Sequence, residues 1–145
     1  RLEKFVKEWP KEVPLAIELR NTEWFTDEEI LNTTCDLFDA HNITNIIVDT
    51  AGRRDMLHMR LTTPNAFIRY VGANAESDYE RLDDWLKHLT KWKKEGLQNL
   101  YFFVHQNIEK ASPLLSAYFI KKLNEEWKTD IHVPQMATES TGTLF

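Results

Sequence analysis

The chain has 145 residues, of which 42% are hydrophobic and 28% charged, and this composition suits one globular domain and excludes collagen-like or disordered classes. Its net charge of -5 disfavours a nucleic-acid partner, because nucleic-acid-binding surfaces carry a basic excess. No apolar run reaches the roughly 18 residues that a membrane span requires, so we expect no membrane partner either.

The first elements along the chain are a helix and a short strand. Residues 1–9 carry apolar side chains at helical spacing, and Pro10 ends this pattern. A helix that begins at the first residue suggests that the natural protein continues upstream. Residues 15–20, LAIELR, predict a strand on which side chains alternate between faces, so that Glu18 and Arg20 share one face.

A helix, a strand and an irregular segment follow. Thr26 and Glu29 form a capping box that predicts the start of the second helix. Residues 45–50, NIIVDT, predict the second strand, with Asp49 near its end. Residues 51–65 have no regular apolar period, and we expect a loop there with at most a short helix.

The third unit repeats the order of strand and helix. Residues 66–71, AFIRYV, predict a strand on which Phe67, Arg69 and Val71 share one face. Ser77 and Glu80 form a second capping box, and apolar residues then keep a helical period as far as Gly96, which is suited to end a helix.

The fourth unit closes the pattern. Residues 100–105, LYFFVH, predict a strand that ends at His105. Ser112 followed by Pro113 predicts the start of the last helix. Residues 129–145 are expected to form an extended or partly disordered tail.

Strands that alternate with helices predict an α/β fold with parallel strands. A doubly wound sheet and half of a TIM (β/α)8-like barrel both fit, but no glycine-rich phosphate loop follows a strand, which weakens the nucleotide-binding form of the first. We predict that residues 1–128 form a four-stranded half-barrel whose N-terminal half is absent. Its open edges would then need that missing half or a homodimer to cover them.

Polar side chains stand near the end of each predicted strand, where barrel enzymes place their chemistry. We expect these side chains to gather around one opening: Glu18, Arg20, Asp49, Arg69 and His105. Glu18 or Asp49 could act as a general base and His105 as an acid or base, which makes these three the catalytic candidates. The arginines offer forked donors to a phosphate or carboxylate.

Further ligand-binding candidates lie on the loops that follow the first and last strands: Asn21, Trp24 and Asn107. An alternative stays open, in which Glu18 and Asp49 simply pair with arginines in an inner salt-bridge network. Trp24 could likewise pack over the next helix instead of stacking on a ligand. No closely spaced metal motif is present, and we predict neither a metal ion nor a cofactor.

Several motifs together resemble the YecE-like family, the domain of unknown function with the number 72 (DUF72). ELRNTEWF at residues 18–25 resembles the family's E-x-R-[HN]-x-x-W-F signature, and FIRYVG at residues 67–72 is similar to its V-R-x-H-G strand. VDT at residues 48–50 and YFFVHQN at residues 101–107 match further strands. The resemblance implies a TIM barrel of about twice this length, with this chain as its C-terminal half, and no established activity.

The sequence departs from the family pattern at two places. Val71 stands where the family usually has histidine, and His105 with Gln106 stands where an asparagine pair is common. Both places are expected at the opening, so the preferred ligand could differ from that of relatives.

The function that we predict is binding of a small sugar, phosphate or carboxylate ligand, with a hydrolase or isomerase type of activity as its enzymatic form. The alternative is a non-catalytic interaction or scaffold module. A single cysteine, Cys35, excludes an internal disulfide and favours a cytoplasmic location. The other four histidines are expected on loops or helix surfaces: His41, His58, His88 and His132.

Overall fold

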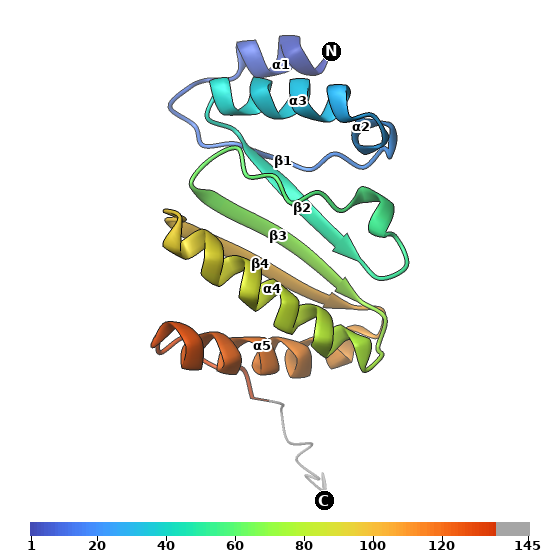
Figure 1. Ribbon diagram of the computed structural model, residues 1–145, viewed down its shortest axis with the longest axis vertical. Coiled ribbons are helices and arrows are strands. Elements are labelled where there is room, and N and C mark those ends of the chain that lie inside the picture. The colour runs from blue at the N-terminus through green and yellow to red at the C-terminus, as the bar shows by residue number, and fades with distance from the viewer. Residues whose placement is uncertain (136–145) are drawn as a thin grey trace, which may run out of the picture.

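The computed structural model describes residues 1–135, and within them strands and helices alternate along the chain (Figure 1). The strands are β1 (Ala16–Ile17), β2 (Thr44–Thr50), β3 (Asn65–Gly72) and β4 (Asn99–Gln106). The helices are α1 (Leu2–Glu8), α2 (Glu23–Thr26), α3 (Glu28–Ala40), α4 (Ser77–Lys94) and α5 (Ser112–Trp127). Two 3-10 turns, η1 (Arg54–Met56) and η2 (Glu109–Ala111), lie in the loops after β2 and β4.

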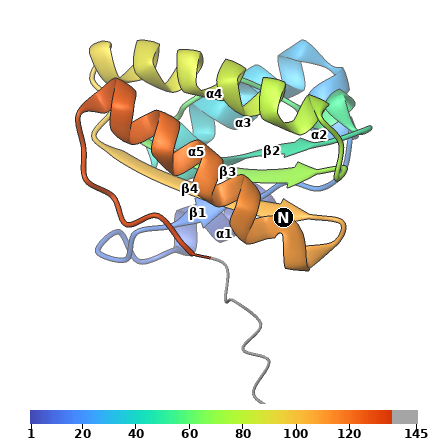
Figure 2. The ribbon, with the colours of Figure 1, turned by 90° about the horizontal axis from the view of Figure 1, so that it is seen from below.

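The strands form one sheet in the order β1-β2-β3-β4, and every neighbouring pair is parallel. Strands that follow one another in sequence order are typical of a barrel, whereas a doubly wound sheet reverses its order at a switch point. Figure 2 shows α3 and α4 on one side of the sheet. The prediction of a parallel α/β fold that forms part of a TIM-barrel-like architecture is confirmed.

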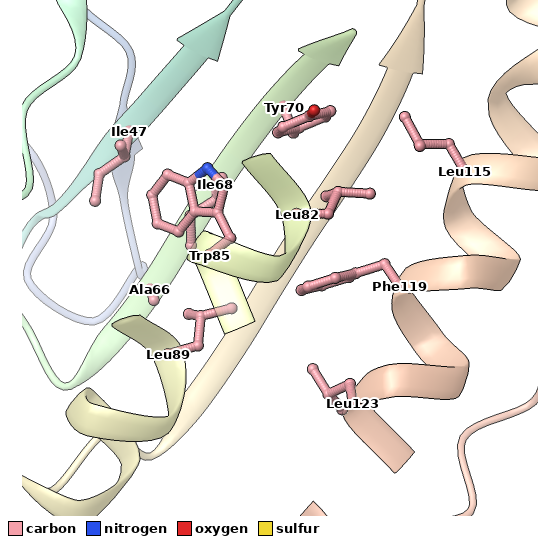
Figure 3. Close-up of a cluster of buried hydrophobic side chains, with 10 residues drawn as sticks. All are labelled: Ile47, Ala66, Ile68, Tyr70, Leu82, Trp85, Leu89, Leu115, Phe119 and Leu123. Atoms are coloured by element: carbon pink, nitrogen blue, oxygen red, sulfur yellow. The ribbon is translucent and has the colours of Figure 1, made fainter. Parts of the chain in front are cut away.

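The sheet has two unlike faces. Ala66, Ile68 and Tyr70 of β3 are fully buried beneath the helices. Figure 3 shows the main core, to which two strands and two helices contribute side chains: Ile47, Ala66, Ile68, Tyr70, Leu82, Trp85, Leu89, Leu115, Phe119 and Leu123. On the opposite face of β4, Tyr101 and Phe103 remain 49% and 47% exposed. We call these the helix-covered face and the open face.

Two predicted helix caps are wrong. Thr26 belongs to the end of α2, and Asp27 instead caps α3 by accepting hydrogen bonds from the backbone N–H groups of Glu29 and Ile30 at 2.8 and 3.2 Å. An aspartate one residue after the threonine therefore takes the capping role, in accordance with its strong preference for this position. At α4, Ser77 is the first helical residue, and Glu76 takes the N-cap position without a side-chain cap.

The segment between β2 and β3 crosses the helix-covered face without an α-helix, and its only regular turn within residues 51–64 is η1, as expected. His58 lies in this crossover, so its predicted place on a loop is correct, but its side chain is buried at 5% exposure. Its ring stacks on Phe25, with the ring centroids 5.3 Å apart. Of the predicted tail, residues 129–135 have no helix or strand, and residues 136–145 lie outside the described part of the chain.

Candidate functional site

An ion-pair cluster lies on the open face at the carboxyl ends of the strands. One oxygen of Glu18, Oε1, accepts a hydrogen bond from Arg20 Nε at 2.8 Å and from Arg69 Nη1 at 3.3 Å. The side chain of Glu18 is 16% exposed, while those of Arg20 and Arg69 are 77% and 38% exposed. Two cations thus share one carboxylate, and the cluster carries a net positive charge next to solvent.

Strand register explains why Glu18 and Arg69 meet. Glu18 follows β1 directly, which places it near the level of Phe67 in β3, and the long side chain of Arg69, two residues further along β3, reaches its carboxylate. Aromatic rings continue this face below Arg69. Phe67 stacks on Phe103 with ring centroids 5.0 Å apart, and Tyr101 lies 5.8 Å from Phe67. The ion-pair cluster therefore lies next to a patch of aromatic side chains on the same face of the sheet.

His105 is on the same open face, one step closer to the carboxyl end. It pairs with Val71, which follows Arg69 by two residues, and side chains two residues apart share a face. His105 is exposed, and so is Asn107 on the loop that follows β4. Of the five side chains predicted to share an opening, Glu18, Arg20 and Arg69 are joined by hydrogen bonds, and His105 lies on the same face of the sheet.

The prediction that Asp49 shares this opening is wrong. Asp49 is 1% exposed and lies on the helix-covered face, where its Oδ1 accepts from Arg81 Nη2 and its Oδ2 from Trp85 Nε1, both at 2.7 Å. Arg54 Nη1 lies 3.5 Å from the same Oδ1. Side chains along β2 alternate between the two faces of the sheet. Asp49 follows the core residue Ile47 by two positions, so both side chains lie on the helix-covered face.

The two candidates on the loop after β1 also have partners away from Arg69. Asn21 accepts the backbone N–H of Glu23 at 3.1 Å and donates to the carboxylate of Glu23 at 2.9 Å, so it orders the start of α2. Trp24 packs against the core cluster that contains Leu19 and Phe38. Trp24 therefore packs against the helix that follows it, which was the predicted alternative to stacking on a ligand.

Sequence reasoning missed the polar residues of the helix-covered face. Arg81 links α4 to two strands, because it also donates to the backbone carbonyls of Asp49 at 3.1 Å and Val71 at 3.3 Å. Its guanidinium carbon lies 4.3 Å from the centre of the Tyr70 ring. The available signal was the spacing of Arg81 and Trp85, which are four residues apart and so reach the same strand end from one helix face.

Two cavities border these residues. One of about 350 Å³ lies between η1 and α4 beside Arg54, Arg81 and His88. The other, of about 470 Å³, lies between the loops after β3 and β4 beside Asn74 and Gln106. Among residues 1–135, no three His, Cys, Asp or Glu side chains are grouped to hold a metal ion, and no helix is long and apolar enough to cross a membrane.

Comparison with known proteins gives one family and a small set of solved structures. A DUF72 family protein of Enterococcus faecalis, EF0366, superposes with a TM-score of 0.65 at 18% identity, over 89% of this chain and 54% of that chain. A DUF72 family protein of Thermotoga maritima, TM1631, superposes with a TM-score of 0.60 at 24% identity, over 88% of this chain and 50% of that chain. At these identities the likeness shows the fold, and this chain spans about half the length of either relative.

A search of curated proteins found no match. The family model described as "Protein of unknown function DUF72" matches residues 1–139, which is nearly the whole chain. Both solved relatives carry the same family description. The chain therefore belongs to the DUF72 family.

Proposed function

We propose that the open face at the carboxyl ends of β1, β3 and β4 binds a small anionic, hydroxylated ligand, such as a sugar that carries a phosphate or carboxylate group. The observation that carries this proposal is the sharing of one Glu18 oxygen between Arg20 and Arg69. Because one carboxylate cannot neutralise two guanidinium groups, the cluster keeps an excess positive charge on the face where barrel proteins bind their ligands.

Each side chain has a distinct chemical task in this proposal. Arg69 is anchored through Nη1, which leaves the rest of its planar fork for two parallel hydrogen bonds to an oxyanion. Glu18 orients both arginines and can accept a ligand hydroxyl. In an enzymatic form, a hydrolase or isomerase type of reaction would use Glu18 as general base and His105 as the partner acid or base.

In this proposal the Arg69 cluster holds the anionic group, and a further wall encloses the rest of the ligand. Parallel sheets bury both faces, yet Phe103 on the open face is 47% exposed. The solved relatives are about twice as long as this chain. We propose that a complementary half-barrel, either a further part of the natural protein or a second copy, completes the pocket. The single buried Cys35 fits a reducing, cytoplasmic setting.

The test is calorimetric titration of this chain with inorganic phosphate and with a hexose phosphate, in the wild type and in Arg69→Ala. We expect Arg69→Ala to weaken binding at least about tenfold, the loss typical of one charge-assisted contact. The matched control is Arg53→Ala, since Arg53 is exposed and its side chain bonds only Asp55 and Met56 among the described residues. Equal weakening in both variants, or no binding by the wild type, would refute the proposal.

A further inference from the structure

The loop after β3 contains a ring of hydrogen-bond donors, and a carboxylate of the same chain accepts their hydrogen bonds. Asp78, in the first turn of α4, is 0% exposed. Both of its oxygens accept from the backbone N–H of Ala73 at 3.0 Å, and Oδ2 also accepts from the N–H of Ala75 at 3.1 Å. Two side chains complete the ring, with Gln106 Nε2 at 3.3 Å and Arg81 Nη1 at 3.3 Å.

The donors around Asp78 outweigh the cost of burying its charge. Burial by itself would raise the pKa of Asp78. The backbone N–H groups of Ala73 and Ala75, the amide of Gln106 and the charge of Arg81 together lower this pKa below its ordinary value. The carboxylate is therefore ionised and acts as a fixed anion within the loop.

Gln106 connects this ring to the neighbouring loop. Its Oε1 accepts the backbone N–H of Asn74 at 3.0 Å, and Asn74 in turn accepts the N–H of Ile108 at 2.8 Å. The backbone N–H of Gln106 donates to Ser112 Oγ at 3.0 Å, at the start of α5. A continuous chain of hydrogen bonds thus runs from α4 through both loops.

Gly72 shows how closely these groups are packed. A Cβ atom at this position would lie 2.3 Å from Gln106 Oε1 and 2.7 Å from Asp78 Oδ2. No side chain fits there without separating Asp78 from Gln106. The backbone of β3 therefore approaches the two side chains as closely as a glycine allows.

We infer that Asp78 is a positioning residue, which occupies the donors of the β3 loop as a built-in anion and, through Gln106, locks that loop to the β4 loop beside His105 and Asn107. In (β/α)8 barrels, backbone donors of such loops frequently bind a ligand phosphate. Here the chain's own carboxylate takes those donors, so the anionic group of a ligand is directed to Arg69 instead. This inference deepens the proposed function. Only its statement about the ligand rests on that function, whereas the coupling of the two loops does not.

The first experiment measures amide hydrogen exchange by NMR in the wild type and in Asp78→Asn. We expect at least about tenfold faster exchange at Ala73 and Ala75, and also at Ile108, which touches Asn74 and not Asp78. The control is Asp84→Asn on the same helix, because Asp84 is exposed and bonds Lys87. Unchanged exchange at Ile108 in Asp78→Asn would show that the loops are independent and overturn the inference.

A second variant keeps the test decisive if Asp78→Asn fails to fold. Gln106→Ala removes the link between the loops and leaves the bonds from Ala73 and Ala75 to Asp78 in place. We expect faster exchange at Asn74 and Ile108 with retained protection at Ala73. Acceleration at all of these amides, or at none, would contradict the assigned order of the hydrogen bonds.

The ligand part is tested by titrating inorganic phosphate while following the His105 imidazole and Arg69 side-chain resonances. We expect saturable shifts in the wild type and in Asp84→Asn, and at least about threefold weaker binding in Asp78→Asn. Equal affinity in all three proteins would overturn the positioning role. Absence of shifts in the wild type would refute the proposed function, whereas the exchange rates would still decide whether Asp78 couples the two loops.

Discussion

The two faces of the sheet use the same kinds of charged residue under opposite conditions. On the helix-covered face, the carboxylate of Asp49 is 1% exposed and has Arg81 and Trp85 as close donors. On the open face, Glu18 shares a single oxygen between Arg20 and Arg69, both of which reach solvent. Charges that are buried must be satisfied internally, whereas charges at an open surface can exchange partners. The comparison teaches that burial decides which acid holds the fold and which can serve a ligand.

The largest expected effect follows from neutralising the buried acid. Asp49→Asn removes the nearer of the two carboxylates that face the buried Arg81 guanidinium and should lower the free energy of unfolding by about 3–5 kcal/mol. Urea denaturation at pH 7 measures this change. A loss below about 1 kcal/mol would mean that the helix-covered face does not depend on this ion pair.

The helix-covered side should also be the more sensitive to acid, because it buries His58. Burial lowers the pKa of His58 from its ordinary 6.5 to about 4. The unfolded chain therefore takes up a proton below pH 6.5 while the folded chain stays neutral, so stability is complete above that pH and falls by about 3 kcal/mol as the pH drops to 4. Urea denaturation across this range should show a shallower fall for His58→Phe. Identical pH profiles would contradict the burial of an uncharged imidazole.

The matched change on the open face should cost far less. Glu18→Gln is the counterpart of Asp49→Asn, and its arginine partners can turn to water. We expect the free energy of unfolding to fall by about 1 kcal/mol or less in the same urea titration. A loss as large as that for Asp49→Asn would make the Glu18 cluster a structural network, as the salt-bridge alternative proposes.

The smallest effect is expected at the most exposed member of the cluster. The side chain of Arg20 is 77% exposed, so its ion pair with Glu18 is weakened by solvent and salt. Arg20→Ala should change stability by less than about 0.5 kcal/mol in thermal unfolding at 150 mM salt. A larger loss would indicate that Arg20 is held as firmly as Arg81.

Much of the fold could be predicted because apolar periods identify strands and helices directly. The four strands are present near their predicted positions, although β1 is short because only Ala16 and Ile17 pair with β2. The error at Ser77 arose because a serine with a glutamate three residues later imitates a capping box. In the structure Asp78 accepts the N–H of Ala75, and this competition between neighbouring side chains is not visible in the pattern.

The candidate site was predictable only in part, for a related reason. The alternation of side chains along a strand predicts which residues share a face, and Arg69 and His105 were placed together on this basis. The alternation does not predict which of the two faces the helices cover. Asp49 was assigned to the opening although it shares its face with the core residue Ile47. Its partners Arg81 and Trp85 lie more than 30 residues away, and such long-range contacts leave no local signal.

The most direct test compares the two arginines in one sample. Inorganic phosphate is titrated into the wild-type protein while the side-chain N–H resonances of Arg69 and Arg81 are followed by NMR. We predict a saturable shift at Arg69 and none at Arg81, whose guanidinium is committed to Asp49 and Asp78. A shift at Arg81, or an unresponsive Arg69, would contradict the assignment of ligand binding to the open face.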